Sequence, residues 1–186
     1  DASAITAISG TGAEVAAVVA GDITTGNYTA AISGTSSAAN ANTVMGDTTG
    51  AVTATVTATG AVSSLNSALS NATSGDALTL VLNATSVAAA DLNTLDGKTS
   101  VAINATSIAT MTGSASAVKT ALESSGITDD GGVVVTLDAG TADATDLTDI
   151  DAVTTATVVA SAITAIAGSG AEVAAVVAGD ITTGNY

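Results

Sequence analysis

The sequence predicts an α/β solenoid: stacked rungs of about 26 residues, each holding one strand and one short helix, with the strands forming a parallel sheet. Three observations predict this fold. A long segment of the chain recurs, extended runs alternate polar and apolar residues, and helical runs begin at capping residues. An all-β solenoid with three short strands per turn is the alternative, because threonine-rich runs such as TATVTAT favour strands.

The first observation is a long internal repeat. Residues 2–28 return at residues 160–186 with 25 of 27 positions identical and a shift of 158 residues. Similar glycine-led segments begin within that period at Gly10, Gly60, Gly113 and Gly168. They divide the period into three repeats of about 53 residues, each containing two rungs. We therefore expect residues 1–186 to form one continuous solenoid segment, a window of a longer tandem array.

Six extended runs are rich in valine, isoleucine and threonine, the residues that suit a pleated surface. They cover residues 28–33, 51–59, 77–84, 101–112, 133–139 and 157–167. In residues 51–59 threonine alternates with an apolar residue, which is the period of a strand with one buried face. We expect the threonines of this run to form buried or half-buried hydrogen-bonding ladders between rungs.

Helical runs alternate with these strands. In residues 11–20, Thr11 and Glu14 have the spacing of a capping box and Gly21 follows as a stop. In residues 114–125, Ser114 is the expected cap. The segments around residues 92–95 and 147–150 are expected to be single turns.

The composition excludes several classes of function. The chain has no His and no Cys, so it cannot build a Ser-His-Asp or Cys-His nucleophile or an ordinary zinc site. Lys98 and Lys119 are its basic residues, and a net charge of −15 disfavours nucleic acid. The longest apolar runs fall far short of the roughly 20 residues of a membrane span. We expect no catalysis, no cofactor, no nucleic-acid partner and no membrane insertion.

One acidic cluster provides the only candidate metal ligands. Carboxylates on turns are hard oxygen ligands that suit Ca²⁺. The candidate calcium ligands are Asp138, Asp143, Asp146, Asp149 and Asp151. The alternative is a solvated acidic surface that keeps neighbouring chains apart.

Two stretches, AADLNTLDGKTSVAINATSI at residues 89–108 and ATVVASAITAIAGSGAEVAAVV at residues 156–177, resemble the repeats of giant cyanobacterial cell-surface proteins of the adhesin-like or motility-associated kind. The resemblance implies secretion without a cleaved N-terminal signal, an extracellular, cell-surface location and a structural or adhesive role.

Repeat pattern, composition and resemblance together predict a non-catalytic repeat segment of a long surface filament, fibril, sheath or adhesin stalk. Its expected partners are neighbouring copies of the same repeat or chain, in a filament or homo-oligomer. The alternative is a calcium- or glycan-binding adhesion module.

Overall fold

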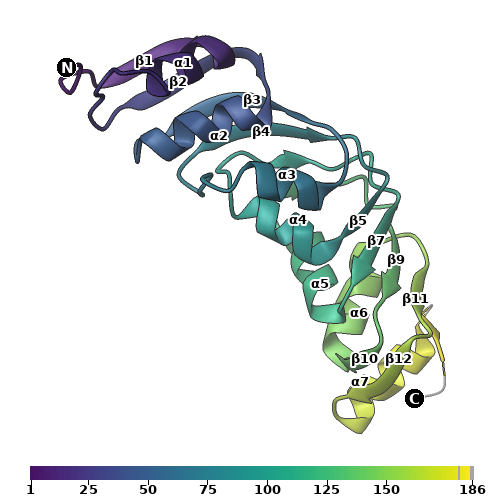
Figure 1. Ribbon diagram of the computed structural model, residues 1–186. Coiled ribbons are helices and arrows are strands. Elements are labelled where there is room, and N and C mark those ends of the chain that lie inside the picture. The colour runs from purple at the N-terminus through teal and green to yellow at the C-terminus, as the bar shows by residue number, and fades with distance from the viewer. Residues whose placement is uncertain (180, 185–186) are drawn as a thin grey trace. The chain divides into compact units, whose positions relative to one another are not determined.

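The computed structural model describes residues 1–179 and 181–184, in which strands and short helices alternate and the strands pair in parallel (Figure 1). The predicted α/β class with parallel sheets is confirmed. The all-β alternative is wrong, because helices follow the strands throughout the described chain. The chain divides into two units, residues 1–83 with 94–104 (unit 1) and residues 84–93 with 105–186 (unit 2).

Unit 1 contains strands that lie side by side in the order β1-β2-β3-β4-β6. Its elements in chain order are β1 (Ala7–Thr11), α1 (Gly12–Val19), β2 (Thr29–Ser36), α2 (Ala38–Asp47), β3 (Val52–Ala58), α3 (Val62–Ala68), β4 (Ala77–Leu82) and β6 (Ile103–Asn104). Helix α1 packs against α2, and α2 packs against α3. Neighbours in sequence are therefore neighbours in space.

Unit 2 contains two sets of parallel strands, β5-β7-β9-β11-β13 and β10-β12. Its elements are β5 (Ser86–Ala88), β7 (Thr110–Gly113), α5 (Ala115–Glu123), β8 (Ile127–Thr128), β9 (Val134–Leu137), β10 (Gly140–Asp143), α6 (Ala144–Val153), β11 (Val158–Ala160), β12 (Ile163–Ala167), α7 (Gly170–Ala178) and β13 (Thr182–Thr183). Helix α4 (Ala89–Asp96) begins in unit 2 and ends in unit 1. Helix α5 packs against α6, and α6 against α7.

The step from one strand to the next is shorter than the predicted rung. Ala7 of β1 lies opposite Thr29 of β2, a separation of 22 positions in the sequence. Thr53 of β3 lies opposite Ala77 of β4, a separation of 24 positions. After an irregularity in β2 the separation between paired positions of β2 and β3 falls to 20. The predicted rung length is therefore wrong for the strands.

The predicted rung length describes the helices better. The N-cap residues of α5, α6 and α7 are Ser114, Asp143 and Ser169, so successive caps are 29 and then 26 positions apart. The glycine-led segments from which the rung length was predicted lie at the starts of helices. Their spacing therefore gives the separation between successive helices and not the separation between paired strands.

The difference between strand and helix spacing has a visible result in unit 2. Strand β7 ends at Gly113, directly before the cap Ser114, whereas β9 ends at Leu137, six residues before the cap Asp143. In the next rung β11 ends nine residues before its cap. The segment between strand and helix thus lengthens from rung to rung, and it forms the additional pair β10-β12.

Two predicted single turns are complete helices. Residues 92–95 belong to α4, which has eight residues, and residues 147–150 belong to α6, which has ten. Helix α6 gains its first turn from Asp143, whose carboxylate accepts a hydrogen bond from the main-chain N–H of Thr145. Leu147 and Ile150 are fully buried and form the apolar stripe through which α6 packs.

The predicted strands are confirmed in part. Residues 101–112 and 157–167 each divide into two strands, because turns interrupt them. In the first of these, the N–H of Ile108 bonds the carbonyl of Ala105 and closes a turn.

The core of unit 1 is built from the inward faces of its strands. In β3 the residues Val52, Ala54, Val56 and Ala58 are buried, and in β4 the three leucines are buried. The threonines of β3 alternate with them and are exposed. The expectation that these threonines form buried ladders is therefore wrong, because the apolar residues of the same strand take the inner face.

No helix in the described ranges is long and apolar enough to cross a membrane.

Neighbouring residues of β4 give a direct test of this burial pattern. Leu80 is 1% exposed and Val81 is 50% exposed. We expect Leu80→Ala to lower the free energy of unfolding by about 2–5 kcal/mol, since it removes buried methyl groups and leaves a cavity. Val81→Ala should change it by about 0.5 kcal/mol or less. Urea unfolding followed by circular dichroism measures both, and equal effects would contradict the assigned faces.

Candidate functional site

Buried threonine hydroxyls recur at equivalent positions of the fold. Thr48, Thr99 and Thr154 are 9%, 7% and 6% exposed, and each is the first residue of a Thr-Thr or Thr-Ser pair that follows a helix. Thr48 is the C-cap residue of α2, and Thr154 is the C-cap residue of α6. We call each such pair a threonine clamp, because its side chains bind the preceding rung.

Thr99 shows the clamp geometry most completely. Its Oγ1 accepts from the N–H of Leu78 at 2.9 Å and donates to the carbonyl of the same residue at 2.9 Å. It also accepts from the N–H of Val101 at 3.1 Å, which tightens its own turn. Both main-chain groups of a fully buried residue, 21 positions earlier, are satisfied by one hydroxyl.

The other clamps share parts of this arrangement. Thr154 donates to the carbonyl of Val133 at 2.7 Å and accepts from the N–H of Ala156 at 3.1 Å. Thr48 accepts from the N–H of Tyr28 at 3.1 Å and bonds the carbonyl of that residue. The separation is again 20 or 21 positions, so the clamps fix the step between rungs near the starts of β2, β4 and β9.

The second member of each pair adds another bond to the preceding rung. Ser100 Oγ donates to the carbonyl of Asp76 at 2.9 Å, and Thr155 Oγ1 donates to the carbonyl of Gly131 at 3.1 Å. Thr49 Oγ1 donates to the side-chain oxygen of Asn27 at 2.8 Å. The signal was present in the sequence, because NTVMGDTTGAV, NTLDGKTSVAI and TDIDAVTTATV align with these pairs in register, but the alignment does not say where the hydroxyls point.

In one rung a carboxylate takes the clamp position. Asp76 is 5% exposed, and its carboxylate accepts from the N–H of Val52 and the N–H of Thr73, both at 2.9 Å. This rung thus also has a buried polar contact with the preceding rung, made by a carboxylate in place of a hydroxyl. A buried carboxylate with two main-chain donors is satisfied where it stands.

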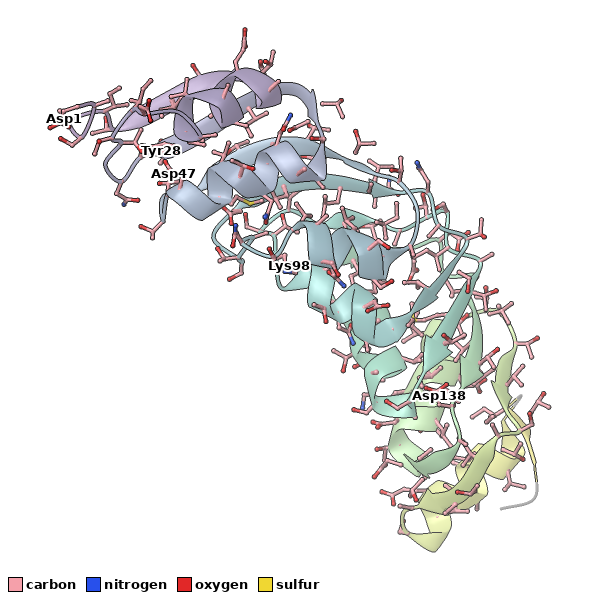
Figure 2. All side chains as sticks on the ribbon, viewed as in Figure 1. Asp1, Tyr28, Asp47, Lys98 and Asp138 are labelled. Carbon is pink, nitrogen blue, oxygen red and sulfur yellow. The ribbon has the colours of Figure 1, made fainter. Side chains whose placement is uncertain are left out.

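Tyr28 has a structural role in unit 1. It is 2% exposed, and its hydroxyl donates to Asp47 at 2.8 Å (Figure 2). Burial, together with the hydrogen bond to Asp47, raises the pKa of Tyr28 far above its ordinary value. Its copy in the long repeat, Tyr186, lies outside the described residues.

The five predicted calcium ligands lie in unit 2 but have separate roles. The carboxylate of Asp143 caps α6 and bonds Thr145, whose hydroxyl and N–H hold the pKa of that carboxyl below its ordinary value. Asp138 is exposed after β9 (Figure 2). Asp151 lines a shallow hollow together with residues 154–157.

Two of the five carboxylates are held by a lysine. Nζ of Lys119 lies 3.2 Å from Asp146 and 2.6 Å from Asp149, and these bonds raise the pKa of the lysine. Among the residues that the structure describes, no three acidic side chains are grouped so that they could hold a metal ion. Calcium binding by Asp138, Asp143, Asp146, Asp149 and Asp151 therefore stays a prediction without geometric support.

The second lysine is also used within its own unit. Nζ of Lys98 donates to the carbonyl of Leu69 at 2.8 Å, at the end of α3. A cation at a helix C-terminus is favourable, because the last carbonyls carry partial negative charge. Both basic side chains thus stabilise the fold.

Comparison of the chain with protein-family models, with curated proteins and with solved structures finds no match. Its function must therefore be inferred from the contacts within the chain.

The clamp predicts a cost for removing one hydroxyl. We expect Thr99→Val to lower the free energy of unfolding by about 1–3 kcal/mol, because the buried N–H and carbonyl of Leu78 lose their partner. Thr99→Ser keeps the hydroxyl and should retain most of the stability. Thr79→Val, on the exposed face of β4, is the matched control and should change it by about 0.5 kcal/mol or less. If Thr99→Val proved as mild as Thr79→Val, the clamp would have no energetic role.

The separation of the five carboxylates predicts the response to calcium. We expect millimolar calcium to leave the melting temperature within the change caused by magnesium at equal ionic strength, because both ions only screen a charge of −15. Thermal melting by circular dichroism, with and without chelator, measures it. A saturable rise specific to calcium would show that the carboxylates rearrange into a site.

Proposed function

We propose that this chain is a structural repeat segment of a long extracellular surface filament, fibril, sheath or adhesin stalk. In this proposal its strand–helix rungs stack as a solenoid, with no catalysis, and neighbouring copies of the same repeat are its partners.

The observation that carries the proposal is the nearest-neighbour pattern of contacts. The strand ladders join residues 20 to 24 positions apart, and the clamps reach back 20 or 21 positions. Each rung is therefore completed by the rung before it and the rung after it. Proteins built in this way gain stability with each added repeat, and length is the property that they can vary most easily.

The surface charge supports the same role. The net charge is −15, and both lysines are engaged in bonds within their own units. A strongly acidic surface keeps long chains apart in solution through mutual repulsion. The hydroxyls of Thr48, Thr99 and Thr154 bond the main chain of the preceding rung, so they connect rungs.

The chemistry of the side chains supports a role without catalysis. The chain has no His and no Cys, and Tyr28 is buried against Asp47. The resemblance to repeats of cyanobacterial cell-surface proteins supports an extracellular location.

Fusion of a second period tests the proposal. A chain in which residues 29–186 are repeated directly after residue 186 adds one period of 158 residues. We expect its urea midpoint and its unfolding slope to exceed those of residues 1–186, because interior rungs gain a second neighbour. In electron micrographs each added period should lengthen the particle by about 30–35 Å, since parallel strands stack at about 4.8 Å.

The control for this experiment joins two complete copies of residues 1–186 through a long Gly/Ser linker, which should melt like a single copy. If the direct fusion also melts like a single copy, the stacking proposal is wrong.

A further inference from the structure

Each unit has an uncharged surface, although the chain as a whole is strongly acidic. This surface is formed by the side chains of β1–β4 in unit 1, and of β5, β7 and β9 in unit 2, that point away from the core, and we call it the outward sheet face. We propose that the outward sheet face of one chain packs against the same face of a second copy. This inference rests on the structural role proposed above and names the surface through which filaments associate side by side.

The charges of the chain are separated from its strands. Within the described strands the single charged residue is Asp143, which ends β10 and caps α6. Helices α1 and α2 contact β2 and β3, and they cover the face of these strands that is buried. The acidic residues on the described helices are Glu14, Asp47, Asp91, Asp96, Glu123, Asp146, Asp149, Asp151 and Glu172. Each unit therefore has an acidic helix layer and a neutral strand layer.

The outward sheet face of unit 1 is built mainly from threonine, serine, alanine and valine. Its centre is Thr55 of β3, which is exposed and lies opposite Thr35 of β2 and Thr79 of β4. Nearer the ends of the strands, Thr57 lies opposite Val81, which is 50% exposed. An aliphatic side chain exposed to this degree gains from being covered.

Unit 2 has an outward sheet face of the same composition. Two rows of side chains cross β5, β7 and β9, and in each row the residues lie opposite one another. The rows are Ser86, Thr110 and Val134, and Ala88, Thr112 and Thr136. The neutral face is therefore a property of both units and not of one strand.

The shape of the face in unit 1 fits a second copy of itself. A shallow hollow of about 290 Å³ lies over the first halves of β1, β2 and β3, and its lining includes Ala7, Ala31 and Ala51. Larger side chains, such as Thr57 and Val81, stand toward the far ends of β3 and β4. A second copy whose strands run antiparallel to those of the first places its larger side chains over this hollow, and the reverse contact forms at the same time. The face is thus self-complementary, as a two-fold contact requires.

Charge favours a second copy as the partner of this face. Copies with a net charge of −15 repel one another wherever their acidic helices approach. When two copies meet through their outward sheet faces, the helix layers lie on opposite outer sides, about 30 Å apart. This is several times the Debye length of about 8 Å at physiological salt, so the repulsion is largely screened. A cationic partner would instead bind the helix layer, where the carboxylates are.

The size of the face predicts weak association for each repeat. The four strands β1–β4 lie about 4.8 Å apart, and six residues of a strand span about 20 Å, which gives about 400 Å² per copy in unit 1. A stable complex of standard size buries about 800 Å² per partner. Residues 1–186 should therefore associate weakly, and longer arrays more strongly, because each period adds the same face.

A charge at the centre of the face tests the proposal. Thr55→Glu on β3 and Ala39→Glu on α2 each add one negative charge at an exposed position. We expect Thr55→Glu to weaken the self-association of residues 1–186 at least tenfold and Ala39→Glu to change it less than twofold. Sedimentation equilibrium from micromolar to millimolar protein measures both, and thermal melting checks that the variants fold like the parent. Equal effects of the two variants, or a parent that stays monomeric throughout, would overturn the proposal.

Salt provides a second readout of the same contact. Because the face is neutral, salt has only the repulsion between the acidic layers to screen. Association of the parent should therefore strengthen when NaCl is raised from about 50 mM to about 500 mM. Association that weakens over this range would show a contact between opposite charges, and the outward sheet face would not be its site.

Cross-linking locates the contact, because the chain has no cysteine of its own. In a two-fold contact the central Thr55 of one copy lies near Thr55 of the other. We expect Thr55→Cys, treated with a short bismaleimide, to give covalent dimers in a yield that rises with protein concentration. Ala39→Cys is the matched control on α2 and should give at least tenfold less dimer at the same concentration. Equal yields would mean that chance collisions, and not this face, bring the chains together.

The outcome is separable from that of the fused copies. If fused copies gain stability but Thr55→Cys and Ala39→Cys give equal yields, stacking within a chain stands and the contact between chains falls. If fused copies gain nothing, the proposed function itself falls, whatever the cross-linking shows.

Discussion

Main-chain pairing between residues 20 to 24 positions apart is the constraint on which the rest of the structure depends. A parallel ladder fixes the distance between strands at about 4.8 Å, so side chains at the same position of successive rungs must fit above one another. The threonine clamps hold this step where a strand begins, at buried amides such as that of Leu78. Without such a partner, each of these main-chain groups would be an unsatisfied buried donor or acceptor.

The helices follow a longer step than the strands, and this mismatch explains features that neither pattern predicts alone. In unit 2 the segment between strand and helix lengthens from rung to rung, and this segment contains β10 and β12. Six helix steps lead from α1 to its repeat α7, whereas the shorter strand step fits nearly seven times into the same sequence period. Because the two steps differ, the position of a helix relative to its strand changes from rung to rung. The period of 158 residues is close to a whole number of both steps.

The sequence predicts those features that depend on a few adjacent residues. The capping boxes at Thr11 and Ser169 and the buried alternation of β3 are of this kind. Prediction fails where the decisive contact lies one rung away. The strand step and the role of Thr99 both depend on partners in the neighbouring rung. The acidic cluster is divided for the same reason, since Lys119, on the preceding helix, takes two of its carboxylates.

The long repeat distinguishes the features set by adjacent residues from those set by the neighbouring rung. Its copies fold alike, with the same capping box and the same parallel bridge between residues near its two ends, because those contacts lie inside the segment. They differ in which face is buried, Val15 in one and Val176 in the other, because burial is decided by the neighbour. The shape of the segment is therefore set by its own sequence, and its buried face by its neighbour. Gly12 and Gly170 illustrate this difference: a Cβ at Gly12 would collide with Ser36 of β2, whereas a Cβ at Gly170 would have nothing within 4 Å.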